Sequence, residues 1–83
     1  MPLNLDDQWI RINDEFDSDG NPLVPLFARM VRTSGGMVVG RIVRLNNGLG
    51  YEAHRYRFGG FNVVGSPGTS IGDAFRTLEE ASA

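Results

Sequence analysis

The chain has 83 residues, of which 41% are hydrophobic and 22% are charged, and its formal net charge at pH 7 is −2. A chain of this length forms one domain with a small core, and its charge excess is too low for wholesale disorder. The absence of cysteine excludes disulfides and thiolate zinc sites, so oligomerisation is the remaining way to bury more surface. We therefore expect a single domain over residues 1–83, with residues 1–7 as a flexible N-terminus and with a homodimer as a possible assembly.

Turns containing glycine divide the chain, and the last three follow one another at steps of about twelve residues. They are Asp17–Asn21, Ser34–Gly36, Asn46–Gly48 and Phe58–Gly60. Gly-Gly and Asn-Gly supply the positive φ angles of tight hairpins, and this spacing is typical of an antiparallel meander. The segments between the turns predict five strands, over residues 8–16, 23–33, 37–45, 50–58 and 61–65.

Side-chain periodicity does not decide whether residues 25–33 form a strand or a helix, but it indicates a helix near the end of the chain. Residues 25–33 fit a helix as well as a strand, because four apolar residues between 26 and 31 share one helical face. The regular turn spacing favours the strand. Near the end of the chain, Ser70 and Asp73 match a capping box with Asp in place of Glu, and apolar residues follow at helical spacing. The sequence thus predicts a helix over residues 70–81 and an α+β fold, an antiparallel β-meander of about five strands with this C-terminal helix packed on it.

Side-chain alternation indicates which strands are covered. The strand over residues 37–45 is apolar on both faces, so we expect it to be central and either covered on both sides or packed across an oligomer interface.

The following strand changes character midway. Tyr51 and Ala53 suit burial on one face, whereas Tyr56 and Phe58 suit burial on the other. A bulge near residues 54–55 would reconcile them by shifting the register. Three charged side chains would then point outward together, namely Glu52, Arg55 and Arg57.

Opposite charges are segregated along the sequence. Residues 1–20 carry six acidic groups against Arg11, and residues 29–57 carry six arginines against Glu52. The planar guanidinium fork suits phosphate, and unpaired bases stack on aromatic or arginine planes. The predicted nucleic-acid-binding residues, on adjacent strands, are Arg41, Arg44, Arg55, Arg57 and Tyr51. The alternative is that these arginines are solvated strand positions that pair with Glu52 and with the acidic N-terminal segment.

The acidic segment indicates a different class of partner. It could imitate phosphate spacing and bind a basic protein that handles nucleic acid, as small phage-type inhibitor or adaptor proteins do; the alternative is a solvated edge hairpin. Its candidate protein-binding residues are Asp14, Glu15, Asp17 and Asp19. The turn Asp17–Asn21 resembles the start of a calcium loop, but Leu26 occupies the position of the bidentate Glu. We expect a plain turn and no metal.

Candidate catalytic residues are few. His54, the only histidine, shares a strand face with Glu52 and Tyr56, and an acid, a base and an arginine could in principle cleave a phosphodiester. A partly exposed strand histidine is the simpler interpretation, and a single histidine cannot build a multi-histidine metal site. We expect no catalytic site and no cofactor. No segment approaches the ~20 apolar residues of a membrane span, so we also expect a cytoplasmic protein.

Residues 38–81 resemble two groups of DNA-binding domains. The segments that carry the resemblance are Gly40–Arg44, Gly50–Arg55, Phe61–Gly65 and Thr77–Ala81. They follow the three-strand-plus-helix pattern of the ethylene-responsive-factor type of plant domain and of the arm-binding domains of phage integrases. In those families the sheet enters the major groove, which implies base or phosphate contacts for the four arginines named above. The acidic N-terminal half, the lack of lysine and the position of Thr77–Ala81 late in the helix depart from that pattern.

The sequence therefore predicts a small non-enzymatic binding module, with nucleic acid bound by an arginine-bearing sheet as the first hypothesis. An acidic inhibitor or adaptor and a self-associating structural subunit are the alternatives.

Overall fold

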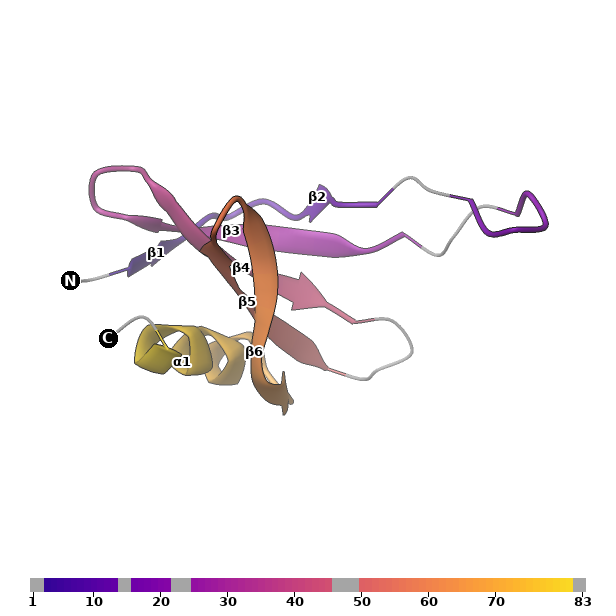
Figure 1. Cartoon of the computed structure of the whole chain (residues 1–83). Coiled ribbons are helices and arrows are strands. Elements are labelled where there is room, and N and C mark those ends of the chain that lie inside the picture. Colours follow the sequence, from indigo (N-terminus) through magenta and orange to yellow (C-terminus); the bar gives the residue numbers. More distant parts are fainter. Residues whose placement is uncertain (1–2, 14–15, 22–24, 46–49, 82–83) are drawn as a thin grey trace.

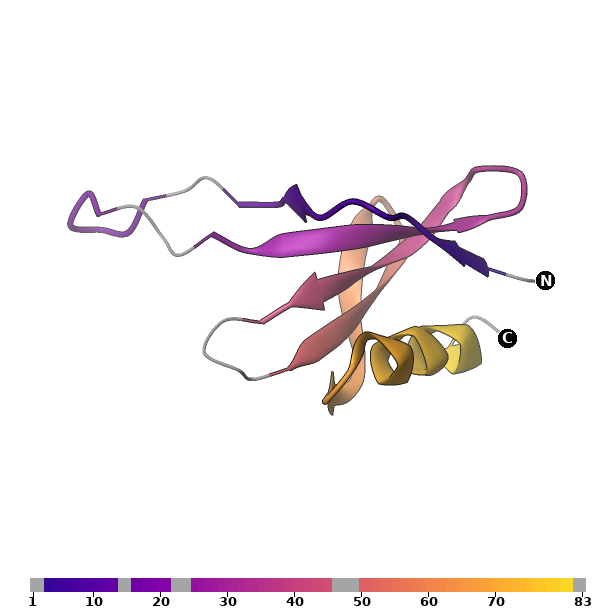
Figure 2. The same cartoon turned by 180° about the vertical axis from the view of Figure 1, so that it is seen from behind.

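The computed structural model describes residues 3–13, 16–21, 25–45 and 50–81. Its elements are β1 (Leu3–Leu5), β2 (Ile10–Arg11), β3 (Phe27–Thr33), β4 (Val38–Arg44), β5 (Tyr51–Arg57), β6 (Gly60–Gly68) and α1 (Ile71–Ala81). The strands form one antiparallel sheet in the order β1-β3-β4-β5-β6, with β2 also paired to β3, and α1 packs on the sheet (Figures 1 and 2). The predicted α+β fold, a meander with a C-terminal helix, is confirmed.

The four long strands follow the predicted ones. Residues 27–33 form β3, which confirms the strand and excludes the helix for that segment. β6 continues to Gly68, three residues beyond the predicted end. The turn predicted at Asn46–Gly48 lies outside the described residues.

The N-terminal part differs from its prediction. The sequence predicts a strand over residues 8–16. Among the described residues of this range, β2 covers Ile10–Arg11 alone. Leu3–Leu5, expected to be flexible, instead pair with Thr33–Val31 as β1, and their leucines pack against the core. Burying two leucines at the free edge of β3 explains this pairing, and three residues are too few for a recognisable period.

The β5–β6 hairpin closes through a two-residue turn of unusual composition. Phe58 and Gly59 both have positive φ angles, of 55° and 78°, which suits a turn whose twist matches that of the strands. The Phe58 side chain is 96% exposed, and Tyr56 is 44% exposed. The predicted burial of these two rings is therefore wrong: the turn geometry carries Phe58 into solvent, and Tyr56 lies in β5 on the sheet face that α1 does not cover.

The predicted bulge is displaced. The ladder between β4 and β5 is continuous over Tyr51–Arg55, and the register shifts at Glu52 instead, where β5 pairs with β6. Side chains consequently alternate through β5, so Glu52 points to the opposite face from Arg55 and Arg57. The prediction that these three charges point outward together is wrong.

The helix begins at a well-formed cap. The Ser70 hydroxyl oxygen accepts a hydrogen bond from the backbone N–H of Asp73 at 3.1 Å, and the Asp73 carboxylate accepts one from the Thr69 hydroxyl at 3.1 Å. The cap satisfies a backbone donor, and a carboxylate in the first turn is favourable beside the positive end of the helix dipole. The helix predicted over residues 70–81 is confirmed.

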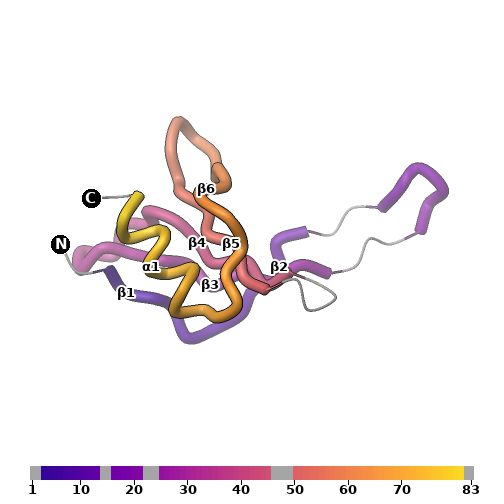
Figure 3. Tube along the Cα trace, turned by 90° about the horizontal axis from the view of Figure 1, so that it is seen from below, coloured from indigo at the N-terminus to yellow at the C-terminus, as the bar shows by residue number. Residues whose placement is uncertain are grey.

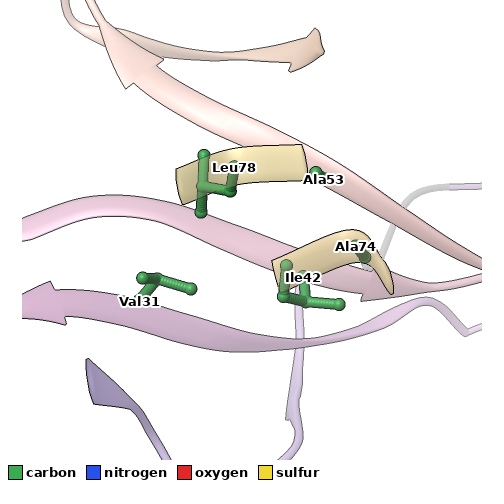
Figure 4. Close-up of a cluster of buried hydrophobic side chains, with 5 residues drawn as sticks. All are labelled: Val31, Ile42, Ala53, Ala74 and Leu78. Carbon is green, nitrogen blue, oxygen red and sulfur yellow. The ribbon is translucent and has the colours of Figure 1, made fainter. Parts of the chain in front are cut away.

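One face of the sheet and one stripe of α1 make the core (Figure 4). The side chains of this cluster, all at most 2% exposed, are Val31, Ile42, Ala53, Ala74 and Leu78. Among the described elements, only α1 packs across a sheet face, so β4 is central but is covered on one side, not on both.

Gly40 allows the helix to approach. A Cβ atom at this position would lie 2.5 Å from the His54 carbonyl oxygen and 2.6 Å from Leu78 Cδ2. Both distances are shorter than any van der Waals contact, so glycine is required where α1 crosses β4.

The molecule is elongated, with extents of 45 × 26 × 23 Å. Its radius of gyration is 13.2 Å, against about 12 Å for a compact chain of this length. The turn over Phe16–Asn21 projects from one end of the sheet, while β1 and the last turn of α1 lie at the other end (Figures 1 and 3). Within the described ranges, no helix has the length and apolar character needed to cross a membrane.

We expect Gly40→Ala to destabilise the fold by about 1–3 kcal/mol, because the added methyl group meets a backbone carbonyl that cannot rotate away. Gly60→Ala is the matched control, since no atom lies within 4 Å of its added Cβ. Urea unfolding of both variants measures the difference. Equal stabilities would show that Gly40 does not limit the helix–sheet approach.

Candidate functional site

The four arginines predicted to form one patch are divided between the two faces of the sheet. Alternation along β4 and β5 places Arg41 on the face away from α1, and Arg44, Arg55 and Arg57 on the face that α1 packs against. Arg44 pairs with Tyr51 across the two strands. Arg55 and Arg57 follow Tyr51 by four and six residues, which is about 13 and 20 Å along β5. The single arginine patch predicted from the sequence is therefore not formed.

Two of the predicted residues do come together, at one end of the helix-covered face. Arg44 and Tyr51 are cross-strand partners, and Trp9 joins them from the segment between β1 and β2. The Arg44 guanidinium carbon lies 4.9 Å from the centroid of the Trp9 ring and 5.4 Å from that of Phe27. The Trp9 and Tyr51 rings stack with centroids 6.1 Å apart, and Arg29 lies 5.7 Å from the Trp9 centroid. We call these five residues the Trp9 cluster.

An open hollow of about 340 Å³ adjoins this cluster. It is lined by Arg44, Leu45, Gly50, Tyr51 and Thr69. Arg44 is exposed and forms no ion pair with any carboxylate that the structure describes, whereas Arg29 lies 3.8 Å from Asp7. Arg44 is thus the cation of the cluster that is best placed to meet an anionic ligand.

Arg41 belongs to a polar row on the opposite face. Its Nε–H donates to His54 Nδ1 at 3.0 Å, and His54 Nε2–H donates to Glu52 Oε1 at 2.7 Å. Because Nδ1 accepts a hydrogen bond, these contacts assign a neutral imidazole with its proton on Nε2. The Arg41 guanidinium carbon lies 4.2 Å over the Phe61 ring, and burial lowers the pKa of Arg41 from its ordinary value. Both nitrogens of the chain's only histidine are engaged.

Of the predicted acidic residues, Asp14 and Glu15 lie outside the described part of the chain. Asp17 and Asp19 lie in the projecting turn and are exposed. Asp17 Oδ1 accepts hydrogen bonds from the backbone N–H groups of Asp19 and Asn21, both at 2.9 Å. This carboxylate organises a plain turn.

The described charge pairs between the N-terminal segment and the sheet involve other residues. Asp6 pairs with Arg32 at 3.1 Å, and Asp7 pairs with Arg29. The acidic segment therefore neutralises arginines of β3. No such pair involves Arg44, Arg55 or Arg57 within the part of the chain that is described.

Comparisons with protein-family models, with curated proteins and with solved structures found no match to this chain. No group of three or more His, Asp or Glu side chains that could hold a metal ion occurs within the described ranges.

Sequence reasoning missed Trp9, the main new residue of the site. It lies outside the arginine-rich region, and its place over Arg44 depends on the pairing of two very short strands with β3. The signal that was available is that Trp9 is the only tryptophan in the chain.

Arg44→Met keeps the apolar stem of the side chain and removes its charge. We expect a loss of less than about 1 kcal/mol in the free energy of unfolding, because exposed cation–π contacts contribute about 0.5–1 kcal/mol. Urea unfolding followed by Trp9 fluorescence measures it. A loss above about 2 kcal/mol would identify Arg44 as a structural residue instead.

Proposed function

We propose that this protein is a small non-enzymatic binding module that takes up an unpaired segment of nucleic acid at the Trp9 cluster. The observation that carries the proposal is the exposed Arg44 guanidinium, stacked on Trp9 beside Tyr51 and an open hollow. Modules for single strands combine arginine or lysine for the phosphates with aromatic faces for the bases. Arg44 and Tyr51 supply both parts on one pair of strands.

Charge favours a single strand over a duplex as the ligand. Duplex binding through a sheet uses a row of cations, and here the arginines are split between two faces and two ends of the sheet. Stacking needs only one aromatic face per base and little positive charge, which suits a chain with a net charge of −2. Asp7 weakens the field of Arg29, so Arg44 provides the main phosphate contact.

Binding without chemistry is supported by the state of the polar row. His54 has Arg41 on one ring nitrogen and Glu52 on the other, so neither nitrogen is placed to move a proton on a ligand. The Trp9 cluster contains no histidine, cysteine or serine to act as base or nucleophile.

A titration with short oligonucleotides tests the proposal. Single-stranded DNA or RNA should quench the fluorescence of Trp9, the only tryptophan, because a base stacks beside its ring. Log affinity should fall with log salt at a slope of about −0.7 to −1.4, as one or two phosphate contacts require. Duplex DNA of the same length should bind more weakly.

Two variants locate the site. Arg44→Met should weaken binding about tenfold or more, as expected for loss of one charged hydrogen bond. Arg57→Met is the matched control, because Arg57 is also exposed and lies 5.5 Å over an aromatic ring, that of Phe58, but stands at the far end of β5. Equal effects of the two substitutions, or no quenching at low salt, would refute binding at the Trp9 cluster.

A further inference from the structure

A second surface, the sheet face away from α1, is unlike the solvated face of an ordinary antiparallel sheet. Besides Asn4 and Arg32 at the β1 edge, the register of the strands places ten side chains on it: Ile10, Ala28, Met30, Arg41, Val43, Glu52, His54, Tyr56, Phe61 and Val63. We call this set the open face. Seven of the ten are apolar or aromatic, whereas a face left to water normally carries polar residues.

The open face lacks a cover in the part of the chain that is described, where the only helix packs on the opposite side. Val63 is 56% exposed, and Ile10 and Tyr56 are 45% and 44% exposed. At the same time Ala28 and Val43 are already buried by their neighbours. The face therefore has buried apolar side chains at its centre and exposed apolar side chains around them.

The polar side chains of the open face neutralise one another. Glu52, His54 and Arg41 form one hydrogen-bonded row across β5 and β4. Tyr56 packs edge-on to Phe61 with ring centroids 5.0 Å apart, and the Arg41 guanidinium carbon lies 4.2 Å from the centroid of the Phe61 ring. Aromatic residues, methionine and arginine with few unpaired charges are the composition found at the centres of protein–protein interfaces.

We propose that the open face binds the open face of a second copy of this chain, related to the first by a two-fold axis. The row of polar residues is acidic at its Glu52 end and basic at its Arg41 end. A two-fold axis through such a row sets Glu52 of each copy against Arg41 of the other, so the surface is complementary to itself. Because the open face carries both Glu52 and Arg41, a second copy of the chain supplies the opposite charge for each of them.

The size of the face limits the area that a dimer can bury. It spans five strands and the seven residues of β4, which is about 19 Å by 23 Å. Two such faces bury on the order of 900 Å² in total, which is below the usual size of stable interfaces and within the range of weak, transient ones. We therefore expect a reversible dimer whose apparent mass depends on protein concentration.

The dimer is independent of nucleic-acid binding, because the Trp9 cluster lies on the other side of the sheet. Failure of one proposal leaves the other standing. The first measurement is the apparent mass by sedimentation over a dilution series from about 1 μM to 1 mM, where we expect it to double. A constant monomer mass at 1 mM overturns the proposal.

Charge exchange tests the arrangement. Arg41→Glu alone and Glu52→Arg alone each bring like charges together across the two-fold axis, so both variants should stay monomeric. An equimolar mixture of the two restores opposite charges at both contacts and should regain the doubled mass. Single variants that associate like the parent protein, or folded variants whose mixture stays monomeric, overturn the two-fold pairing of Glu52 with Arg41.

Two further variants decide the question if charge exchange prevents folding. Val63→Asp places a charge on an exposed side chain in the open face and should abolish the mass increase. Phe16→Asp is the matched control, because Phe16 is 66% exposed in the projecting turn, away from that face. Equal association by both variants overturns the proposal.

Discussion

The contact between Leu78 and the bare backbone at Gly40 controls how this small domain is assembled. Helix α1 reaches the sheet only because no side chain stands between Leu78 and the strand beneath it. With that approach made, Leu78 and Ala74 are sealed against Ile42 and Ala53 in the described core. In a domain of 83 residues the buried apolar surface is small, so one misplaced methyl group at this crossing affects a large share of the stability.

The side chosen by the helix also decides what each arginine does. Arg44 and Arg41 are three residues apart in β4 and therefore point to opposite faces. Arg44 stands on aromatic rings at the rim of the helix-covered face, exposed to solvent. Arg41 is half-buried and held by His54 and Phe61 on the open face. One strand thus holds an exposed cation on one side and a half-buried, hydrogen-bonded arginine on the other.

The sequence was sufficient to predict the features that depend on local chemistry. The turns near Gly36 and Gly59 have positive φ angles that their residues signal, and the Ser70 cap is a matter of neighbouring atoms. These signals predicted the meander and the helix. Features that depend on distant pairing were missed, among them β1, which is three residues long and exists because it covers the edge of β3.

The candidate site was predicted in part, for an identifiable reason. The pairing of Arg44 with Tyr51 follows from the hairpin and was within reach. Grouping Arg41 with Arg44 conflicted with the alternation of their own strand, which separates them. Hydrophobicity alone placed Phe58 in the interior, whereas the two-residue turn holds it in water.

The dependence of the Trp9 cluster on the edge of the sheet has a consequence for its dynamics. Trp9 lies between β1 and β2, and β2 pairs with β3 at two residues, so this part of the edge can open locally while β1 and the core under α1 stay in place. Opening would remove Trp9 from Arg44 and dismantle the site without unfolding the domain. A ligand that needs the assembled cluster would bind only the closed edge and would hold it shut by mass action. Occupancy of the site and order in the N-terminal segment are therefore thermodynamically linked.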